Sequence, residues 1–252
     1  MTDFWHVSHF ESTLFLLHIQ VYPNCIQIQG IAVQSYALLE EDGLTLIDGG
    51  FLGNPTSRIE VALEAAGRSL GEVKNIIVSH GHIDHTINIA NLAELTGATV
   101  YAPRLDEDHI AGTHRYSGIS RICGFLERSA RLRFGYNVPE VHEWFNSGDE
   151  LPFWGGMKVI PFPGHTEGHC GFYSEERRLL FANDLFANLY GIPKQPPPWF
   201  NGNQAQMRQS IVDANLLDLS GGVIVNHSTN RTPQELRQDL ATLAEQTKKR
   251  YF

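Results

Sequence analysis

The most constraining feature of this sequence is that apolar, strand-like segments repeatedly lead into histidine or aspartate. Four such segments lead into His80, His165, Asp184 and His227. Short apolar runs bounded by turn residues are typical of buried strands. Because strand ends at one edge of a sheet converge in space, separate chain segments can supply one site. The pattern therefore predicts a sheet-based fold with ligand-type side chains gathered at one edge.

The densest group of such residues lies in a single strand-to-helix loop. It comprises His80, His82, Asp84 and His85. In an extended segment His80 and His82 point the same way, whereas the adjacent Asp84 and His85 diverge unless the backbone turns. Gly81 supplies the freedom for such a turn. Imidazole and carboxylate together suit zinc, iron or manganese, and the alternative is a polar loop whose histidines only form hydrogen bonds.

The remaining patterns divide the chain into strands and helices. Residues 13–48 are predicted to form strands broken by turns, and further strand patterns cover 75–79, 98–102, 157–162, 169–173, 179–182 and 222–226. Helical patterns cover 56–66, 86–95, 203–218 and 232–249, the last with Thr232 as N-cap and Pro233 at its first position. The proline-rich residues 193–198 are predicted to be a loop.

Strand-rich and strand-helix stretches occur in both halves, which predicts an α/β fold with two sheets in one sandwich and helices outside. We expect one domain over residues 1–252. The polar segment 103–147 differs from its surroundings and is predicted to be a helical insertion or cap.

Composition narrows the function. With 42% hydrophobic and 19% charged residues, the 252-residue chain can bury a core. The formal net charge of −9 argues against nucleic-acid and anionic-membrane partners, so a small-molecule substrate is expected. Three widely spaced cysteines exclude a disulfide framework and a cysteine-based zinc site. No signal peptide or transmembrane span is predicted, because the apolar stretch Leu14–Val21 is short and interrupted; a cytoplasmic protein is expected.

The ligand-type residues resemble those of the metallo-β-lactamase-fold hydrolase superfamily. The pattern His80-x-His82-x-Asp84-His85, followed by His165, Asp184 and His227, has the family's order and is similar to the set in glyoxalase II and lactonases. The resemblance spans about residues 24–230 and implies a four-layer αβ/βα sandwich with a dinuclear site at one edge. Many relatives differ in having glycine at position 183 and a small residue at position 87.

The resemblance also implies a ligand set for two divalent metal ions, zinc first and iron or manganese as alternatives. One ion would be held by His80, His82 and His165, the second by Asp84, His85 and His227, with Asp184 bridging both. Two such ions lower the pKa of a bridging water and supply hydroxide near neutral pH. Asp84 is expected to orient this nucleophile.

The leading hypothesis is a zinc-dependent hydrolase acting on a small carbonyl substrate such as a lactone, a thioester or another ester. A phosphodiesterase or RNA-processing nuclease is the first alternative, and the net charge of −9 counts against it. A β-lactamase is the second alternative. Asp184 counts against it, because β-lactamases of this fold carry cysteine or no bridging acid at the corresponding position. An iron-dependent redox or binding protein is the third, although flavodiiron relatives need a flavin domain for which the chain has no room.

Several residues are candidates for supporting roles. Asp48 follows a strand and is expected to fix a histidine ligand, the alternative being a turn residue. His169 is expected to have a supporting or structural role. Tyr190 lies close to Asp184 in sequence, and lactonases of the superfamily use a nearby tyrosine on the substrate; packing is the alternative. Trp199 and Phe200 are candidates for the wall of an apolar pocket.

The insertion carries its own charge pattern. Between Arg115 and Arg133 there are five arginines and one glutamate, while Ile119, Ile122, Phe125 and Leu126 follow one helical face. This helix either covers the core or forms a homodimer contact, or it presents Arg121 or Arg128 to an anionic group of the substrate. The other histidines have no partner pattern and are expected to be ordinary: His6, His9, His18, His109, His114 and His142.

Overall fold

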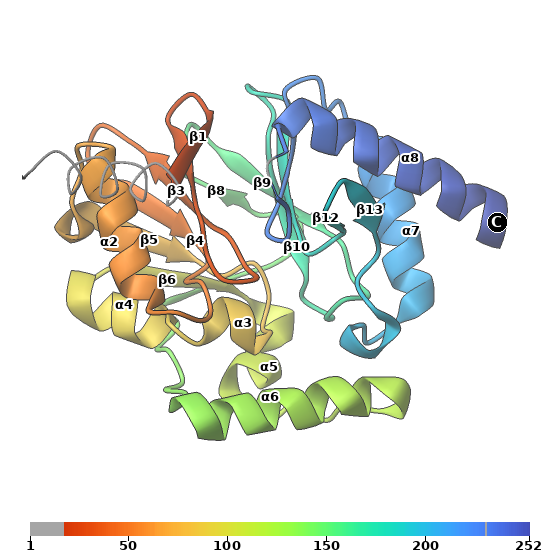
Figure 1. Cartoon of the computed structure of the whole chain (residues 1–252), viewed down its shortest axis with the longest axis horizontal. Helices are drawn as coiled ribbons and strands as arrows, with labels where there is room; N and C mark the ends of the chain where they lie inside the picture. The colour runs from red at the N-terminus through yellow and green to blue at the C-terminus, as the bar shows by residue number, and fades with distance from the viewer. Residues whose placement is uncertain (1–17, 230) are drawn as a thin grey trace, which may run out of the picture.

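The computed structural model describes residues 18–229 and 231–252. His6, His9 and the start of the strand-rich region expected from residue 13 lie outside the described residues. Two sheets face each other, and helices cover both outer faces (Figure 1).

The first sheet has seven strands in sequence order. They are β1 (His18–Tyr22), β2 (Cys25–Ile28), β3 (Ser35–Leu39), β4 (Leu44–Ile47), β5 (Val73–Ile77), β6 (Thr99–Pro103) and β7 (Glu143–Phe145). β1 to β4 form an antiparallel meander, and β4 to β7 are parallel. Parallel strands need crossover connections, which α2 (Pro55–Ala65) and α4 (Ile89–Thr96) supply here.

The second sheet has five strands in the order β14, β11, β10, β9, β8. Their bounds are β8 (Glu150–Leu151), β9 (Met157–Pro161), β10 (Cys170–Ser174), β11 (Leu179–Asn183) and β14 (Gly222–Val225). On its outer side lie α7 (Gln204–Ala214) and α8 (Pro233–Tyr251) (Figure 1). Thr232 caps α8 as predicted, because its side chain accepts a hydrogen bond from the Glu235 backbone and that of Glu235 accepts one in return.

Three hydrophobic clusters separate the four layers. Ile76 packs in the cluster between the first sheet and its helices, whereas its neighbour Ile77 packs between the two sheets. Successive side chains of a strand point to opposite faces, so one strand feeds two cores. The third cluster, which includes Leu180 and Leu240, lies between the second sheet and the helices α7 and α8. The predicted αβ/βα sandwich is confirmed.

The segment 103–147 differs in part from its prediction. It contains α5 (Glu107–Ala111) and α6 (Arg121–Phe134), and α6 runs along the lower edge of the sandwich in Figure 1. Its last residues, however, form β7, which pairs with β6 and buries Phe145 between the sheets. The insertion therefore ends before residue 143, because the first sheet gains its edge strand there.

Two further predictions need correction. The helix expected over 86–95 is two helices, α3 (Ile83–Thr86) and α4, so the ligand-bearing loop runs directly into a short helix. The proline-rich loop expected over 193–198 begins with β13 (Ile192–Lys194), which pairs with β12 (Ala187–Leu189). Within the described ranges, no helix has both the length and the apolar character needed to cross a bilayer.

Candidate metal centre

The histidines and aspartates singled out in the sequence meet at one edge of the two sheets. Oδ2 of Asp184, which follows β11, lies 3.0 Å from Nε2 of His227, after β14. The same oxygen lies 3.4 Å from Nε2 of His85 and 3.5 Å from Nε2 of His165. Nε2 of His80, after β5, is 4.0 Å away. One carboxylate oxygen thus stands among four imidazole nitrogens that come from three strand ends, those of β5, β9 and β14.

The donor atoms form two groups around this carboxylate. In the first group, three nitrogens lie within 4.8 Å of one another; they belong to His80, His82 and His165. In the second group, one oxygen and two nitrogens lie equally close; they belong to Asp84, His85 and His227. These groups have the same members as the two ligand sets that the family resemblance implies. Asp184 lies against members of both groups, at the position expected of a bridging carboxylate.

The hydrogen bonds behind the cluster fix which ring nitrogen faces it. Four histidines use Nδ1 for a hydrogen bond to an oxygen outside the cluster. The pairs are His80 with Ser79 Oγ at 3.0 Å, His85 with Asp48 Oδ2 at 2.8 Å, His165 with Asn201 Oδ1 at 2.9 Å, and His227 with the Ala32 carbonyl at 2.7 Å. A neutral ring that donates from Nδ1 carries a bare lone pair at Nε2. All four rings therefore turn Nε2 toward the centre, where it is an acceptor in the neutral ring.

His82 has the opposite orientation. Its Nδ1 lies 2.9 Å from Nε2 of His165, while its Nε2 faces the thiol of Cys123 at 3.9 Å. Two ring nitrogens this close, with a third from His80 nearby, are arranged to share one cation.

The polar atoms left without partners test whether a metal fits this site. Nε2 of His80, Nε2 of His85 and Oδ1 of Asp184 are buried and have no hydrogen-bond partner among the described residues. A buried polar atom without a partner costs about 1–3 kcal/mol, and several side by side are a strong destabilising feature. Imidazole nitrogens and carboxylate oxygens are the donors that zinc and related divalent ions bind. The residues present therefore fit a metal centre.

Protonation states differ between the donor groups, because Asp184 raises the pKa of His85 and of His227 above its usual range against the effect of burial. Burial holds the pKa of His80 and of His82 well below its usual range, so both rings are neutral and can act as ligands. Burial opposes ionisation of Asp184, but His227 and His85 outweigh it and hold the pKa of this carboxyl well below its usual range. Asp184 is therefore a carboxylate at neutral pH.

Asp48 lies beneath the cluster, at the end of β4, where the sequence analysis expects a residue that fixes a histidine ligand. It is fully buried and accepts hydrogen bonds from the backbone and hydroxyl of Ser79 at 2.8 and 2.7 Å. Nδ1 of His85 donates to the Asp48 carboxylate at 2.8 Å, and the side-chain amide of Asn226 donates to it at 2.9 Å. Because the Ser79 hydroxyl donates to Asp48, it can accept from His80. Asp48 thus orients two of the ligand-type histidines, one directly and one through Ser79.

His169 holds the backbone of Asp184. Its Nδ1 donates to the carbonyl of Phe162 at 2.9 Å, and its Nε2 accepts from the Asp184 amide at 3.1 Å. Burial lowers the pKa of His169 to about 3, so the ring stays neutral and keeps this donor–acceptor pattern. These contacts place His169 behind Asp184, and its supporting role stays a prediction.

Asp106 is a supporting residue that the sequence analysis missed. It is fully buried, and one of its oxygens accepts from the Gly81 amide at 2.7 Å and from the Thr166 hydroxyl at 2.6 Å. The other accepts from the Gly168 amide at 2.7 Å. The carboxylate thereby joins the two loops that carry His82 and His165. Its place in the polar insertion gave no signal of this role.

Gly81 is needed for space rather than for a turning backbone. A Cβ added at Gly81 would lie 2.3 Å from Cβ of His109 and 3.2 Å from the Asp106 carbonyl oxygen. Its φ is outside the left-handed region, so the expected role in freeing the chain is corrected. Glycine is required because α5 packs directly on the ligand loop.

Glu127 ties α6 to the same loop. Its buried carboxylate accepts from the backbone of Ile83 at 3.1 Å and from the hydroxyl of Tyr116 at 2.7 Å. Ile83 is the first residue of α3, next to Asp84. The insertion is therefore fastened to the centre by two buried carboxylates, Asp106 and Glu127.

The centre opens into a pocket of about 560 Å³. Its floor carries His82, Asp84, His165, Asp184 and His227. Most of the remaining wall is apolar and includes Phe51, Leu126, Phe186, Leu189 and Phe200. No lysine or arginine lines it within the described part of the chain.

The residues predicted to contact substrate divide into two sets. Phe200 lines this pocket, whereas its neighbour Trp199 does not. Tyr190 is 90% exposed at the turn between β12 and β13, so the structure does not bring it to the pocket. Arg121 and Arg128 line a different pocket, on another side of α6.

Comparison with known proteins agrees with the fold and the centre. A family model described as the metallo-β-lactamase superfamily matches residues 29–218, more than half of the chain. The chain belongs to the metallo-β-lactamase superfamily. Solved structures of the superfamily share its architecture at low identity. A family protein of Thermus thermophilus has a TM-score of 0.68 at 20% identity, over 91% of this chain and 81% of that one. The metallo-β-lactamase GOB-18 of Elizabethkingia meningoseptica has a TM-score of 0.69 at 18% identity. The match covers 93% of this chain and 90% of that one.

Sequence relatives within the superfamily include named hydrolases. The probable metallo-hydrolase YflN of Bacillus subtilis is 24% identical over 220 residues, which cover 81% of this chain and 83% of that protein. A hydroxyacylglutathione hydrolase of Rhizobium meliloti is 31% identical over 127 residues, which cover 50% of this chain and 39% of that enzyme.

One departure from the pattern that the resemblance implies has a structural explanation. Asn183 stands where the resemblance implies glycine, and its φ of 51° lies in the left-handed region. Asparagine tolerates this conformation better than other side chains. Its amide also donates to the Cys170 carbonyl at 2.7 Å, so the substitution keeps the backbone that carries Asp184.

Proposed function

We propose that this chain is a dinuclear, zinc-dependent hydrolase of a carbonyl ester or thioester with an apolar acyl group. One observation carries the proposal: a cluster of bare histidine and aspartate donors forms the floor of a pocket whose wall is mostly apolar and carries no described cationic side chain. The proposed substrate class includes lactones, because a lactone is a cyclic ester.

The donor set fits two divalent ions. His80, His82 and His165 would hold one ion, Asp84, His85 and His227 the other, and Asp184 would contact both. Zinc is proposed because imidazole nitrogen with carboxylate oxygen is a typical zinc donor set. Two such ions supply activation of water near neutral pH and polarisation of the substrate carbonyl.

The chain's own residues supply position and proton handling. The Asp84 side chain is 29% exposed at the pocket floor, and its Oδ2 lies 3.7 Å from His85 Nε2 and 3.8 Å from His227 Nε2. It is the carboxylate of the floor with the greatest access to a substrate and an attacking water. We propose that it orients this water and accepts its proton, while Asp48 and His169 keep the ligands in place.

The lining supports a carbonyl substrate over a phosphodiester. A phosphodiester carries a negative charge, which proteins usually meet with arginine or lysine, and the described pocket wall has neither. Phe51, Phe186 and Phe200 instead offer apolar area to an acyl chain. The similarity to hydroxyacylglutathione hydrolases, which are named for a thioester substrate, points the same way.

A hydrolysis panel on the zinc-loaded protein tests the proposal. It compares acyl thioesters and p-nitrophenyl esters of increasing chain length with a lactone, a phosphodiester and a β-lactam. We expect the highest kcat/KM for an ester or thioester, rising with acyl length, and its loss in Asp184→Asn but not in the surface control Asp108→Asn. A higher kcat/KM for the phosphodiester or the β-lactam would overturn the substrate class.

A further inference from the structure

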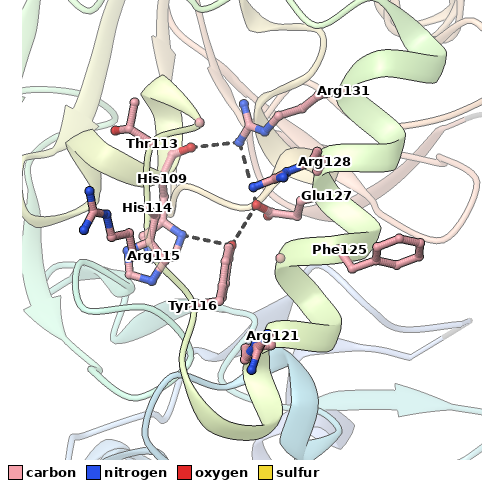
Figure 2. Close-up of a pocket in the computed structure, with 12 residues that line it drawn as sticks. His109, Thr113, His114, Arg115, Tyr116, Arg121, Phe125, Glu127, Arg128 and Arg131 are labelled. Carbon is pink, nitrogen blue, oxygen red and sulfur yellow. Dashed lines mark hydrogen bonds and ion pairs between the residues drawn. The ribbon is translucent and has the colours of Figure 1, made fainter.

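A second, larger pocket lies beside α6, apart from the metal centre. Its volume is about 670 Å³, within the range of small-molecule sites. One wall is the segment after α5, with His114 and Arg115; the other is α6, with Arg121, Arg128 and Arg131 (Figure 2). Four arginines therefore surround one cavity in a chain whose net charge is −9.

Three of these arginines have no protein partner among the described residues. Arg115, Arg121 and Arg128 are exposed, and among the described residues they form no ion pair within 4.0 Å and no hydrogen bond. Like charges that surround one cavity without counter-charges repel each other. An anion between these exposed side chains would relieve the repulsion that water and salt do not screen.

Arg131 is the fixed member of the group. Its Nη2 donates to the His109 carbonyl at 2.8 Å, and its guanidinium lies over the Tyr136 ring at 4.0 Å. Its Nη1 is buried and has no hydrogen-bond partner among the described residues. This orphaned donor belongs to a side chain that lines the pocket, so it marks one place where an anionic oxygen would be bound.

The acidic groups at this pocket are already engaged. Glu127, which also lines it, accepts hydrogen bonds from Tyr116 and Ile83 and lies 3.8 Å from Arg131. Glu167 does not line the pocket, and its carboxylate is paired with the pocket residue His109 at 3.2 Å. Burial lowers the pKa of His114, so that ring is neutral and adds a hydrogen-bonding group rather than a charge. The cavity therefore keeps a net positive charge.

The arginine pocket is distinct from the metal pocket. Residues 121, 124, 125, 128 and 131 of α6 line the arginine pocket, and residues 123, 126 and 130 line the metal pocket. At about 100° per residue these two sets lie on opposite faces of the helix. Glu127 lies between the two sets and lines both pockets.

From this geometry we propose that the arginine pocket binds a small organic molecule with two or more phosphate groups. Arginine meets phosphate with parallel N–H donors, and four arginines exceed what one carboxylate can pair with. On α6 the arginines extend from residue 121 to residue 131, a rise of about 15 Å. This length suits an extended ligand such as a nucleoside diphosphate better than a single inorganic ion.

Titration calorimetry on the full-length, zinc-loaded protein tests the proposal, with ADP as probe and adenosine as its neutral analogue. We expect ADP to bind and adenosine not to. Arg121→Gln and Arg128→Gln should each weaken ADP binding at least about tenfold, which is 1.4 kcal/mol. Arg133→Gln is the matched control, because Arg133 lies on the same helix over the Phe134 ring and does not line the pocket.

Equal ADP affinity in Arg121→Gln, Arg128→Gln and Arg133→Gln would overturn the proposal, since the probe would then bind at the metal centre or nowhere specific. The binding assay needs no turnover, so it stands or falls separately from the proposed hydrolase activity. Hydrolysis kinetics of a neutral ester in the presence of ADP shows whether the bound phosphate groups belong to the substrate or to a separate effector. Competition by ADP would show that the phosphates belong to the substrate, and a change in kcat without competition would show a separate effector.

Discussion

Replacing Asp106 by asparagine should loosen the metal centre without touching any metal-ligand candidate. The carboxylate takes three hydrogen bonds of 2.6–2.7 Å, two at Oδ2 from Gly81 and Thr166 and one at Oδ1 from Gly168. Asparagine has one carbonyl oxygen, so at best it keeps the two at Oδ2. Its NH₂ then faces the Gly168 N–H, and two donors oppose each other in a fully buried site.

The expected cost follows from these contacts. A hydrogen bond to a charged group contributes about 1.5–3 kcal/mol, and a buried donor without an acceptor costs about 1–3 kcal/mol. Asp106→Asn should therefore lower the free energy of unfolding by roughly 2.5–6 kcal/mol. Because the carboxylate joins the loops of His82 and His165, zinc affinity should fall as well, by about 10–100-fold as for other supporting residues.

Urea unfolding and competitive zinc titration measure the two effects. Asp108→Asn is the control, because Asp108 is an exposed residue of the adjacent α5 whose carboxylate accepts one hydrogen bond, from the Thr113 hydroxyl at 3.2 Å. If Asp106→Asn has the same free energy of unfolding and the same zinc affinity as Asp108→Asn, then Asp106 does not join the two ligand loops.

Other predictions concern single groups. Gly81→Ala should cost about 1–3 kcal/mol in urea unfolding, because its Cβ would lie 2.3 Å from that of His109, whereas Gly71→Ala, with no neighbour closer than 4.0 Å, should be nearly neutral. Tyr190→Phe should leave kcat/KM for esters within about twofold, since the side chain is 90% exposed; a tenfold loss would place the hydroxyl at the substrate. The hydrogen bond with His109 lowers the pKa of Glu167 from 4.5 to about 2. Glu167 therefore adds stability above pH 4.5 that is lost as the pH falls toward 2, and Glu167→Gln should flatten this part of the unfolding profile; an unchanged profile would contradict the shift.

The layers of the fold and the ligand-type residues could be predicted because their signals are local. A buried strand is a short apolar run, and His80, His165, Asp184 and His227 each follow one within a few residues. The strand β7 was missed because it has three residues and its partner, β6, lies some forty positions earlier.

Two supporting residues, Asp106 and Asn201, escaped prediction for a related reason. Asp106 meets its partners 25 to 62 positions away, and Asn201 reaches His165 across 36. Neither residue differs locally from an ordinary polar loop residue, so only the packed structure shows the contact. The arginines of α6 were visible in the sequence, but the pocket they line depends on how α5 and α6 pack.

The metal content of the purified protein tests the central claim most directly. Seven donor residues converge here, in two groups joined by Asp184, so elemental analysis should find about two divalent ions per chain. The surface variant Asp108→Asn should give the same value. One ion or none per chain, after saturation with zinc and removal of the excess, would contradict the dinuclear centre.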